Sequence, residues 1–454
     1  MRTRFLAVLP LLCVTAFIAS PATAQRSLTL NDALDLARRN NRDLQSARAR
    51  LAGVDATIEQ ARVALLPTVT AQGKYTHNIP EVVVSLPPGM TGGAPRQAAI
   101  TPADQLDASL TALVPLVVPA AYSAYAAAKK NQTASEADLH VTETRLLFTT
   151  AQIFYAAAST DELVIARRHA VEVAEQTLRN AQTRFESGTA TKVETSRAQL
   201  SLVRAQQAVR EAGEQQANAY AQLSTLIREP LGFVVQPPPV AENDTIGSDA
   251  PDLLVRQAFE MRPEFAAYQM RMEALSANID SMSWRWAPTL SAFGNARAFN
   301  YAGFSGRNAA LAIGLQLDWV VFDGGARDAQ RHALEAQILD THLQLDQARS
   351  TIADEVRQAR RSIDTRRSAM QAAQQAVELS RETLDLVRVQ YEAGTALQID
   401  LLSAQDDLIG AEVGLAQARF DLALADLTLQ RNAGTFLGAH GSTAATSAPA
   451  QATP

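Results

Sequence analysis

The sequence contains one six-residue pattern twice, and each copy separates two long helical stretches. The copies are Phe185-Glu186-Ser187-Gly188-Thr189-Ala190 and, 206 positions later, Tyr391-Glu392-Ala393-Gly394-Thr395-Ala396. A glycine suits the C-terminus of a helix because it enters the left-handed conformation freely. The repetition therefore predicts two long helical hairpins in a chain that arose by duplication.

Apolar residues around the second copy follow a seven-residue period. They step by threes and fours from Met370 to Tyr391 and again from Ile399 to Leu427, which is the spacing of a coiled-coil seam. The stretch from Tyr122 to Glu186 has no proline and no glycine, so it can form one helix of about 65 residues, roughly 100 Å long. These features alone would also fit an ordinary coiled-coil or spectrin-like rod.

The N-terminus is typical of a secretory signal peptide over residues 1–24. Arg2 and Arg4 precede an apolar run, and Ala22-Thr23-Ala24 forms a small-x-small cleavage site. The run is short for a membrane anchor, which is the alternative interpretation. Cys13 is the only cysteine and lies inside this segment. The mature chain from Gln25 is therefore expected to form no disulfide and no thiolate metal site.

Composition excludes several classes of function. Without the two arginines of the signal peptide, 39 basic residues stand against 47 acidic ones, a formal charge of −8, which argues against a nucleic-acid partner. The six histidines are scattered, with no His-Glu-x-x-His pair, nucleophile elbow or phosphate loop, so we expect neither an enzyme nor a metal or cofactor site. No later stretch approaches 18 consecutive apolar residues, so no helix of the mature chain is expected to span a bilayer.

A second landmark marks the two halves. Pro67 and Pro288 lie in similar segments at an offset of 221, and the helical patterns before them match at the same offset. We therefore predict two structural repeats, a Pro-rich linker between them and a disordered tail rich in small residues. The predicted divisions are residues 25–229, 230–251, 252–432 and 433–454.

In each half the spacing of apolar residues changes between the first and second long helices. It changes from the helical period of about 3.6 residues to alternation at every second residue. Four segments alternate in this way, namely residues 66–76, 105–118, 287–300 and 309–322. Segments of this length with one apolar face suit transmembrane β-strands, although a soluble sheet packed on a core is the alternative.

Aromatic residues favour the membrane interpretation. They lie at the helix-proximal ends of the strands, where an aromatic girdle at the membrane interface is expected: Trp284, Trp286, Trp319 and Phe322. Because four strands cannot close a barrel, two or three chains would have to pool their strands.

These features together resemble the TolC-like outer-membrane factors, a family of trimeric exit ducts. The resemblance extends from about Leu28 to Asn432 and includes both glycine turns and the segment Val321-Phe322-Asp323-Gly324-Gly325, which leads from the last strand into a long helix. In the first half Val118-Pro119-Ala120-Ala121 stands in its place. The resemblance implies a mainly α fold with a transmembrane β-barrel portion: a long α-helical barrel plus four strands per protomer of a trimeric twelve-stranded barrel. The linker at 230–251 would join an equatorial collar.

The resemblance also implies roles for residues at the two turns. A periplasmic adaptor protein would contact the tips, comprising Gly188, Thr189, Ala190, Gly394, Thr395 and Ala396. Asp400 matches a gate aspartate of the family, Glu194 is its first-repeat equivalent, and Ser403 stands where a second aspartate is expected. A ring of three carboxylates would bind cations and repel anions. Tyr391 matches a tyrosine that links neighbouring helix pairs in the closed state, and its equivalent Phe185 has no hydroxyl.

The function implied is an outer-membrane duct of a Gram-negative bacterium, extending into the periplasm. As a homotrimer in outer-membrane lipid it would passively export substrates delivered by an adaptor and an inner-membrane transporter of the RND, MFS or ABC class. A type I secretion duct is an alternative within the same family. A structural trimeric coiled-coil envelope protein is an alternative from a different class, but it does not account for the alternating strands.

Overall fold

The computed structural model describes residues 26–86, 96–236, 250–301 and 307–440. The predicted signal peptide, the proline triplet of the linker and the end of the tail lie outside these ranges. Side chains within 85–99 and at 439–440 are also outside the description.

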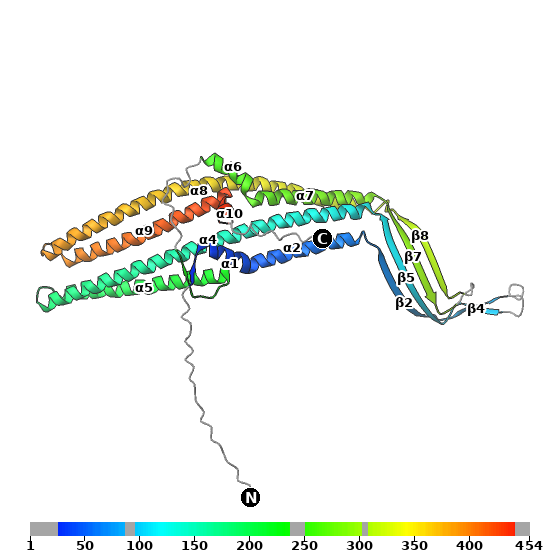
Figure 1. The fold of residues 1–454 in the computed structure, drawn as a ribbon, viewed down its shortest axis with the longest axis horizontal. Helices are drawn as coiled ribbons and strands as arrows, with labels where there is room; N and C mark the ends of the chain where they lie inside the picture. Colours follow the sequence, from blue (N-terminus) through cyan, green and yellow to red (C-terminus); the bar gives the residue numbers. More distant parts are fainter. Residues whose placement is uncertain (1–25, 87–95, 237–249, 302–306, 441–454) are drawn as a thin grey trace, which may run out of the picture.

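The molecule is elongated, with the ends of two helical hairpins at one extremity and a β-sheet at the other (Figure 1). Its elements in chain order are β1 (Arg26–Leu28), α1 (Leu30–Asn40), α2 (Arg42–Val63), β2 (Thr68–His77), β3 (Val82–Leu86), β4 (Arg96–Thr101), β5 (Asp104–Val117), α4 (Pro119–Glu186), α5 (Lys192–Ile227), β6 (Phe233–Val235), α6 (Pro251–Met261), α7 (Pro263–Ser283), a 3-10 turn η1 (Trp284–Trp286), β7 (Thr289–Phe299), β8 (Ala309–Asp318), α8 (Ala326–Glu392), α9 (Gln398–Ala433) and α10 (Phe436–His440).

Both halves follow the same plan, in which a broken helix leads into strands and then into a long hairpin. Helices α4 and α8 have 68 and 67 residues, which corresponds to about 100 Å at 1.5 Å per residue. Their partners α5 and α9 have 36 residues each. Helix α4 begins at Pro119, three residues before the predicted start, because proline is well tolerated in the first helical turn.

The first helix of each half is interrupted at corresponding positions. In the first half the side chain of Asn41 accepts hydrogen bonds from the backbone of Asp43 (2.8 Å) and Leu44 (3.3 Å), which starts the second helix. In the second half Arg262 stands at the break and Pro263 starts α7. Leu44 and Phe265, paired by the offset of 221, are both buried.

The four long strands form one antiparallel sheet in the order β2-β5-β7-β8. The predicted strands exist, but the last one ends earlier than expected. β8 stops at Asp318, and the residues up to Gly325 form a loop between the strand and α8. β2 and β8 are the two open edges of this sheet.

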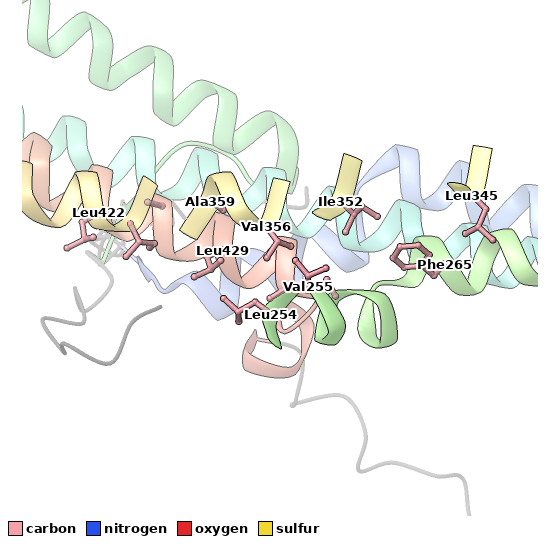
Figure 2. Packing of buried hydrophobic residues seen from close by; sticks show 13 residues of the cluster. Leu254, Val255, Phe265, Leu345, Ile352, Val356, Ala359, Leu422 and Leu429 are labelled. Carbon is pink, nitrogen blue, oxygen red and sulfur yellow. The ribbon is translucent and has the colours of Figure 1, made fainter. Parts of the chain in front are cut away.

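The hydrophobic core lies in the middle of the molecule, where several helices meet. In the second half, apolar residues of α6, α7, α8 and α9 pack together around Val356 and Ile363, which are fully buried (Figure 2). In the first half, Phe154 and Leu223 pack with residues of α1 and of β1 and β6. This is the region in which helices lie more than two deep, so larger side chains find full burial there.

Parts of the predicted linker and of the predicted tail have regular structure. Part of the linker at 230–251 is β6, which pairs in parallel with β1, a strand that the sequence did not reveal. Phe233 and Val235 are buried in the core and anchor this pair.

The tail predicted to be disordered from residue 433 is ordered at its beginning. α9 extends to Ala433, Gly434 caps it with φ +81°, and α10 follows. Phe436 is 1% exposed and packs edge-on against Phe148 of α4. One aromatic side chain with a pocket to fill is enough to hold this segment against the helices.

Candidate functional site

The sheet has one mainly apolar face, because the registers of all three strand pairs align apolar positions; the pair His77–Asp104 lies on the same face at the end far from the helices. Val69 and Ala71 of β2 lie opposite Ala112 and Leu110 of β5. Leu110 lies opposite Ala296 of β7, which in turn lies opposite Leu311 of β8. The pleat sends these side chains to the same side of the sheet. Polar residues such as Gln72, Ser109, Asn295 and Gln316 occupy the other face.

In the described part of the chain, the large side chains of the apolar face are exposed to solvent. Leu311 and Ile313 are 71% and 79% exposed, and Leu110 is half exposed. An exposed apolar surface of this extent requires a partner or a lipid environment. The soluble-sheet alternative, in which this face rests on a core, therefore does not describe the molecule.

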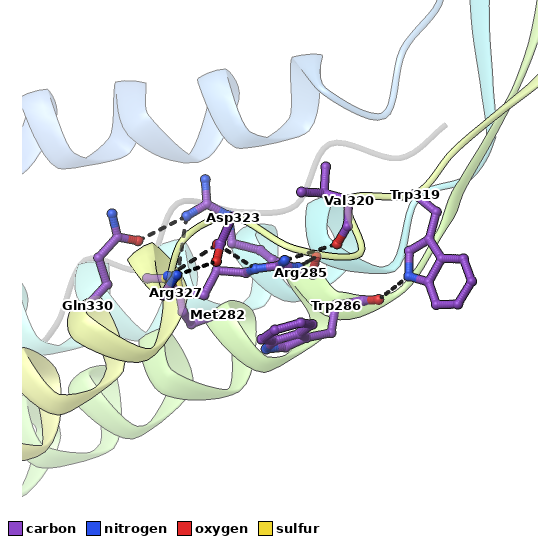
Figure 3. A network of polar contacts seen from close by, with 9 residues as sticks. Met282, Arg285, Trp286, Trp319, Val320, Asp323, Arg327 and Gln330 are labelled. Atoms are coloured by element: carbon purple, nitrogen blue, oxygen red, sulfur yellow. Dashed lines mark hydrogen bonds and ion pairs between the residues drawn. The ribbon is translucent and has the colours of Figure 1, made fainter.

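A buried arginine organises the junction between the sheet and α8. Arg327 is 6% exposed, and its guanidinium donates hydrogen bonds to the carboxylate of Asp323 (2.6 Å) and to the carbonyl oxygens of Arg285 (2.8 Å) and Val320 (2.9 Å) (Figure 3). It also stacks on the ring of Trp286, 3.6 Å from its centre. One side chain thus ties together the 3-10 turn η1, the loop after β8 and the start of α8.

Asp323 explains the structural role of the Phe-Asp-Gly-Gly segment. Its carboxylate accepts hydrogen bonds from the backbone N–H groups of Gly325 and Arg327, both at 3.2 Å, at the N-terminus of α8. Partial burial would raise the pKa of the Asp323 carboxyl, but the hydrogen bonds from Arg327 outweigh it and hold the pKa below its usual range. Gly324 and Gly325 have φ of +70° and +87°, which explains the need for glycine at both positions.

The predicted aromatic girdle lies at this junction. Trp284, Trp286, Trp319 and Phe322 are all well exposed at the helix-proximal end of the sheet. The indole N–H of Trp319 donates to the carbonyl of Trp286 at 3.1 Å (Figure 3). Trp286 and Trp319 therefore meet on neighbouring segments, although the assignment of the four residues to a membrane interface stays a prediction.

The two tips, residues 187–191 (tip 1) and 393–397 (tip 2), have the same backbone. Gly188 and Gly394 both have φ +76°. The hydroxyl groups of Thr189 and Thr395 each donate a 3.0 Å hydrogen bond to the carbonyl five residues earlier, at Arg184 and Gln390. The two copies of the hexapeptide share the order Gly-Thr because the glycine supplies the left-handed conformation and the threonine supplies the hydroxyl that donates this hydrogen bond.

The predicted gate carboxylates cap helices in this structure. The Glu194 carboxylate accepts a hydrogen bond from the backbone N–H of Thr191 at 3.1 Å. The Thr191 hydroxyl oxygen in turn accepts one from the backbone N–H of Glu194, which completes a capping box. Asp400 likewise accepts from the N–H of Leu397 at 3.0 Å. Leu397 has no polar side chain, so the box at tip 2 is only half formed. A capping role does not exclude a role in a channel, because the Asp400 side chain is still exposed.

The two hairpins touch near the tips through residues that the sequence did not single out. The amide of Gln398, 5% exposed, donates to the carbonyl of Glu194 at 2.9 Å. The guanidinium of Arg184 lies over the ring of Tyr391, 4.5 Å from its centre. Burial raises the pKa of the Tyr391 phenol, and the charge of Arg184 lowers it only in part. Tyr391 thus links one helix pair to the other within a single chain, whereas Phe185 is half exposed.

A groove of about 520 Å³ runs between α4, α5 and α9 just behind the tips. Ser403 lines it together with Arg197, Arg204 and Asp406. Ser403 therefore lies beside the groove between the hairpins, one turn from Asp400.

Comparisons with known proteins agree with this architecture. The model of the family described as "Outer membrane efflux protein" matches residues 33–227 and 254–435, one segment in each repeat. The chain belongs to the outer membrane efflux protein family. Its location is accordingly the outer membrane.

Several relatives share most of its length. The outer membrane protein TolC of Vibrio cholerae is 23% identical over 94% of this chain and 95% of its own. The pyoverdine export outer membrane protein OpmQ of Pseudomonas aeruginosa is 29% identical over 65% of this chain and 63% of its own.

Solved structures show the same fold. CusC has a TM-score of 0.73 at 15% identity, covering 89% of this chain and 92% of its own. The open state of the Neisseria gonorrhoeae outer membrane channel MtrE has a TM-score of 0.70 at 18% identity, covering 90% and 89%. The fold of this efflux family protein is thus TolC-like, with a long helical portion and a β-barrel portion.

Two kinds of feature are absent from the described residues. None of the helices there has a stretch both long and apolar enough to cross a membrane. Nor do those residues contain a cluster of three or more side chains suited to hold a metal ion.

Proposed function

We propose that this protein is the outer-membrane exit duct of a tripartite efflux pump. The observation that carries the proposal is the sheet: four long strands with an unpartnered apolar face and two open edges, joined directly to helices about 100 Å long. In an outer membrane the apolar face turns to lipid and the polar face lines a lumen. An envelope spacer would need no such sheet.

The open edges support a homotrimer. A free edge exposes unpaired N–H and C=O groups, which cannot remain unsatisfied in lipid. Pairing β8 of one chain with β2 of the next satisfies both edges, and three copies give the twelve strands of a closed barrel.

The helices offer matching edges. Packing places them in the order α5-α4-α9-α8 across one chain, so that α5 and α8 are the outer ones. Each carries an exposed apolar stripe with the same steps of seven and three residues near its tip, formed by Val193, Leu200 and Val203 on α5 and by Leu379, Leu386 and Val389 on α8. In a ring of three copies these stripes would meet between neighbouring chains.

The tips are the proposed docking points for a periplasmic adaptor protein. The glycine turns expose short backbone segments at the extremity opposite the sheet (Figure 1). Asp400 is the proposed gate residue, with Glu194 and Tyr391 on the surfaces that close against it. The energy for export would come from an inner-membrane transporter of the RND, MFS or ABC class.

A second candidate within the same family is the outer-membrane duct of a type I secretion system. It is favoured by the alkaline protease secretion protein AprF of Pseudomonas aeruginosa, which is 23% identical over 61% of this chain. Deletion of the gene separates the two functions. Increased sensitivity to small toxic compounds with an unchanged set of secreted proteins supports efflux, and the reverse result supports secretion.

Single-channel recording of the purified protein in planar bilayers tests the duct itself. We expect a stable conductance from preparations that migrate as heat-modifiable trimers. A trimer without any conductance would contradict the proposal and would favour a structural role in the envelope.

The same recordings test the gate. Asp400→Ala should raise the conductance or weaken block by divalent cations added on the helical side, because it removes a ring of carboxylates. Glu194→Ala, which breaks the other cap, is the matched control and should change block less. Equal divalent block in wild type and Asp400→Ala would place the constriction elsewhere.

A further inference from the structure

The polar face of the sheet has an uneven distribution of charge. Among the residues of its four strands, the charged side chains on this face are Lys74, Asp107 and Arg297 at the end far from the helices, and Asp318 at the end near them. On this face the far end therefore carries two cations and one carboxylate in each chain, and the other carboxylate at that end, Asp104, lies on the opposite face beside His77.

The three distal residues form one cluster on neighbouring strands. Lys74 of β2 lies directly opposite Asp107 of β5. Arg297 of β7 is on the diagonal, with its Nη2 atom 3.9 Å from the Oδ1 atom of Asp107. Because the cluster has two cationic side chains and a single carboxylate, its formal charge is positive.

The Asp107 side chain is largely buried, whereas the side chains of Lys74 and Arg297 are exposed to solvent. The Asp107 side chain is 13% exposed and accepts a 2.7 Å hydrogen bond from the amide of Gln105. Its Oδ1 atom is buried without a hydrogen bond. The Arg297 side chain is 53% exposed, with its guanidinium 6.0 Å from the centre of the Phe299 ring, and Lys74 is exposed.

We propose that Lys74 and Arg297, set by Asp107, form an anion-binding ring in the lumen at the outer end of the barrel. This inference rests on the proposed trimeric duct, in which three copies place six cationic side chains around three carboxylates. A narrow passage with low-dielectric walls focuses the field of such a ring, as basic rings do in anion-selective pores. The ligands are solutes with several phosphate or carboxylate groups.

The ring would act at the opposite end of the duct from the acidic tip residues. An anionic solute that leaves the helical part would meet an attractive site just before release. Its occupancy should fall with ionic strength, because screening at about 1 M salt shortens the range of the attraction to a few ångströms.

The test uses planar bilayers with the purified full-length trimer and sodium tripolyphosphate added on the side of the strand loops. We expect reversible block of the wild-type conductance, and weaker block when the same concentration is added on the helical side. Arg297→Gln or Lys74→Gln should raise the dissociation constant for block by about tenfold, and Asp107→Asn should lower it. Arg331→Gln is the matched control, since Arg331 lies on α8 and already pairs with Glu335 at 2.9 Å.

The opposite signs separate an electrostatic site from structural damage, which would move all three variants in one direction. A normal conductance with no block, or with block that none of the three variants changes, overturns the ring but leaves the duct intact. A folded trimer with no conductance overturns the proposed function, and the ring with it. The reversal potential in a potassium chloride gradient is a second readout, and Arg297→Gln should shift it toward cation preference.

Discussion

The two tips of the molecule have kept one backbone, whereas the two junctions between strand and helix have not. Tip 1 and tip 2 share the same φ at glycine and the same threonine hydrogen bond. At the first junction β5 passes through Val118 directly into the proline-started α4. At the second, a loop containing Asp323 and two glycines leads to α8 and is held by Arg327.

This difference shows which features survive duplication of a chain. A tip is stabilised by hydrogen bonds between residues at most six positions apart, so its sequence pattern is sufficient to rebuild it. A junction depends on the segments packed around it. In the second half these are the end of α7 and the 3-10 turn with its tryptophans. The second junction therefore has a structure that differs from that of the first.

Arg327→Leu should break the second junction and have the largest effect on stability. It leaves the carboxylate of Asp323 and two backbone carbonyls without their buried donor, which should destabilise the fold by about 3 kcal/mol. Thermal unfolding of the purified protein measures the loss. Arg331→Leu removes an exposed ion pair one turn later and should cost almost nothing; similar melting temperatures for both variants would show that the clamp is not needed.

Gly188→Ala and Gly394→Ala test the equality of the two tips. A Cβ at either position meets nothing within 4 Å, so only the left-handed backbone is strained, which costs about 1–2 kcal/mol. We expect equal increases in hydrogen exchange at the two turns. Gly414→Ala, in the middle of α9 with open space around it, should instead stabilise by up to about 1 kcal/mol. A large difference between the two tip variants would mean that only one tip is shaped by its glycine.

The tips differ in their N-cap residues, and substitutions at these residues can remove the difference. Thr191→Ala should weaken tip 1 by about 1 kcal/mol, because it removes the side chain that caps α5. Leu397→Thr should strengthen tip 2 by a similar or smaller amount, since Leu397 is 69% exposed and Asp400 already supplies half of the box. Limited proteolysis at the tips reports both changes, and protection in the first variant would contradict the capping assignment.

The smallest effect is expected at the contact between the hairpins. Tyr391→Phe keeps the ring beneath Arg184 and should change stability by less than about 0.5 kcal/mol, whereas Tyr391→Leu should cost about 0.5–1 kcal/mol by losing the cation–π contact. Phe185→Tyr at the corresponding position should have no effect, because Phe185 is half exposed. Chemical denaturation of the three variants measures the order. Equal losses for Tyr391→Phe and Tyr391→Leu would show that the hydroxyl, and not the ring, makes the important contact.

Much of this fold could be anticipated from local patterns. The glycine turns, the long helices and the four alternating strands all follow from spacings within one segment. The membrane interpretation of the strands gained support from the structure, because the registers bring most of the large aliphatic side chains to one face. Phe436 was missed because one aromatic residue among small ones gives no periodic signal. The pair β1–β6 was missed because three residues are too few to show alternation.

The sequence by itself determined the duplication, the positions of both tips and the amphipathic character of the strands, because these depend on the dihedral preferences and spacing of neighbouring residues. Only the tertiary structure decided that Arg327 clamps the second junction, that Gln398 meets Glu194 and that Lys74, Asp107 and Arg297 gather on one face. Those contacts join residues far apart in the chain. They depend on strand order, register and helix packing, which no local pattern specifies.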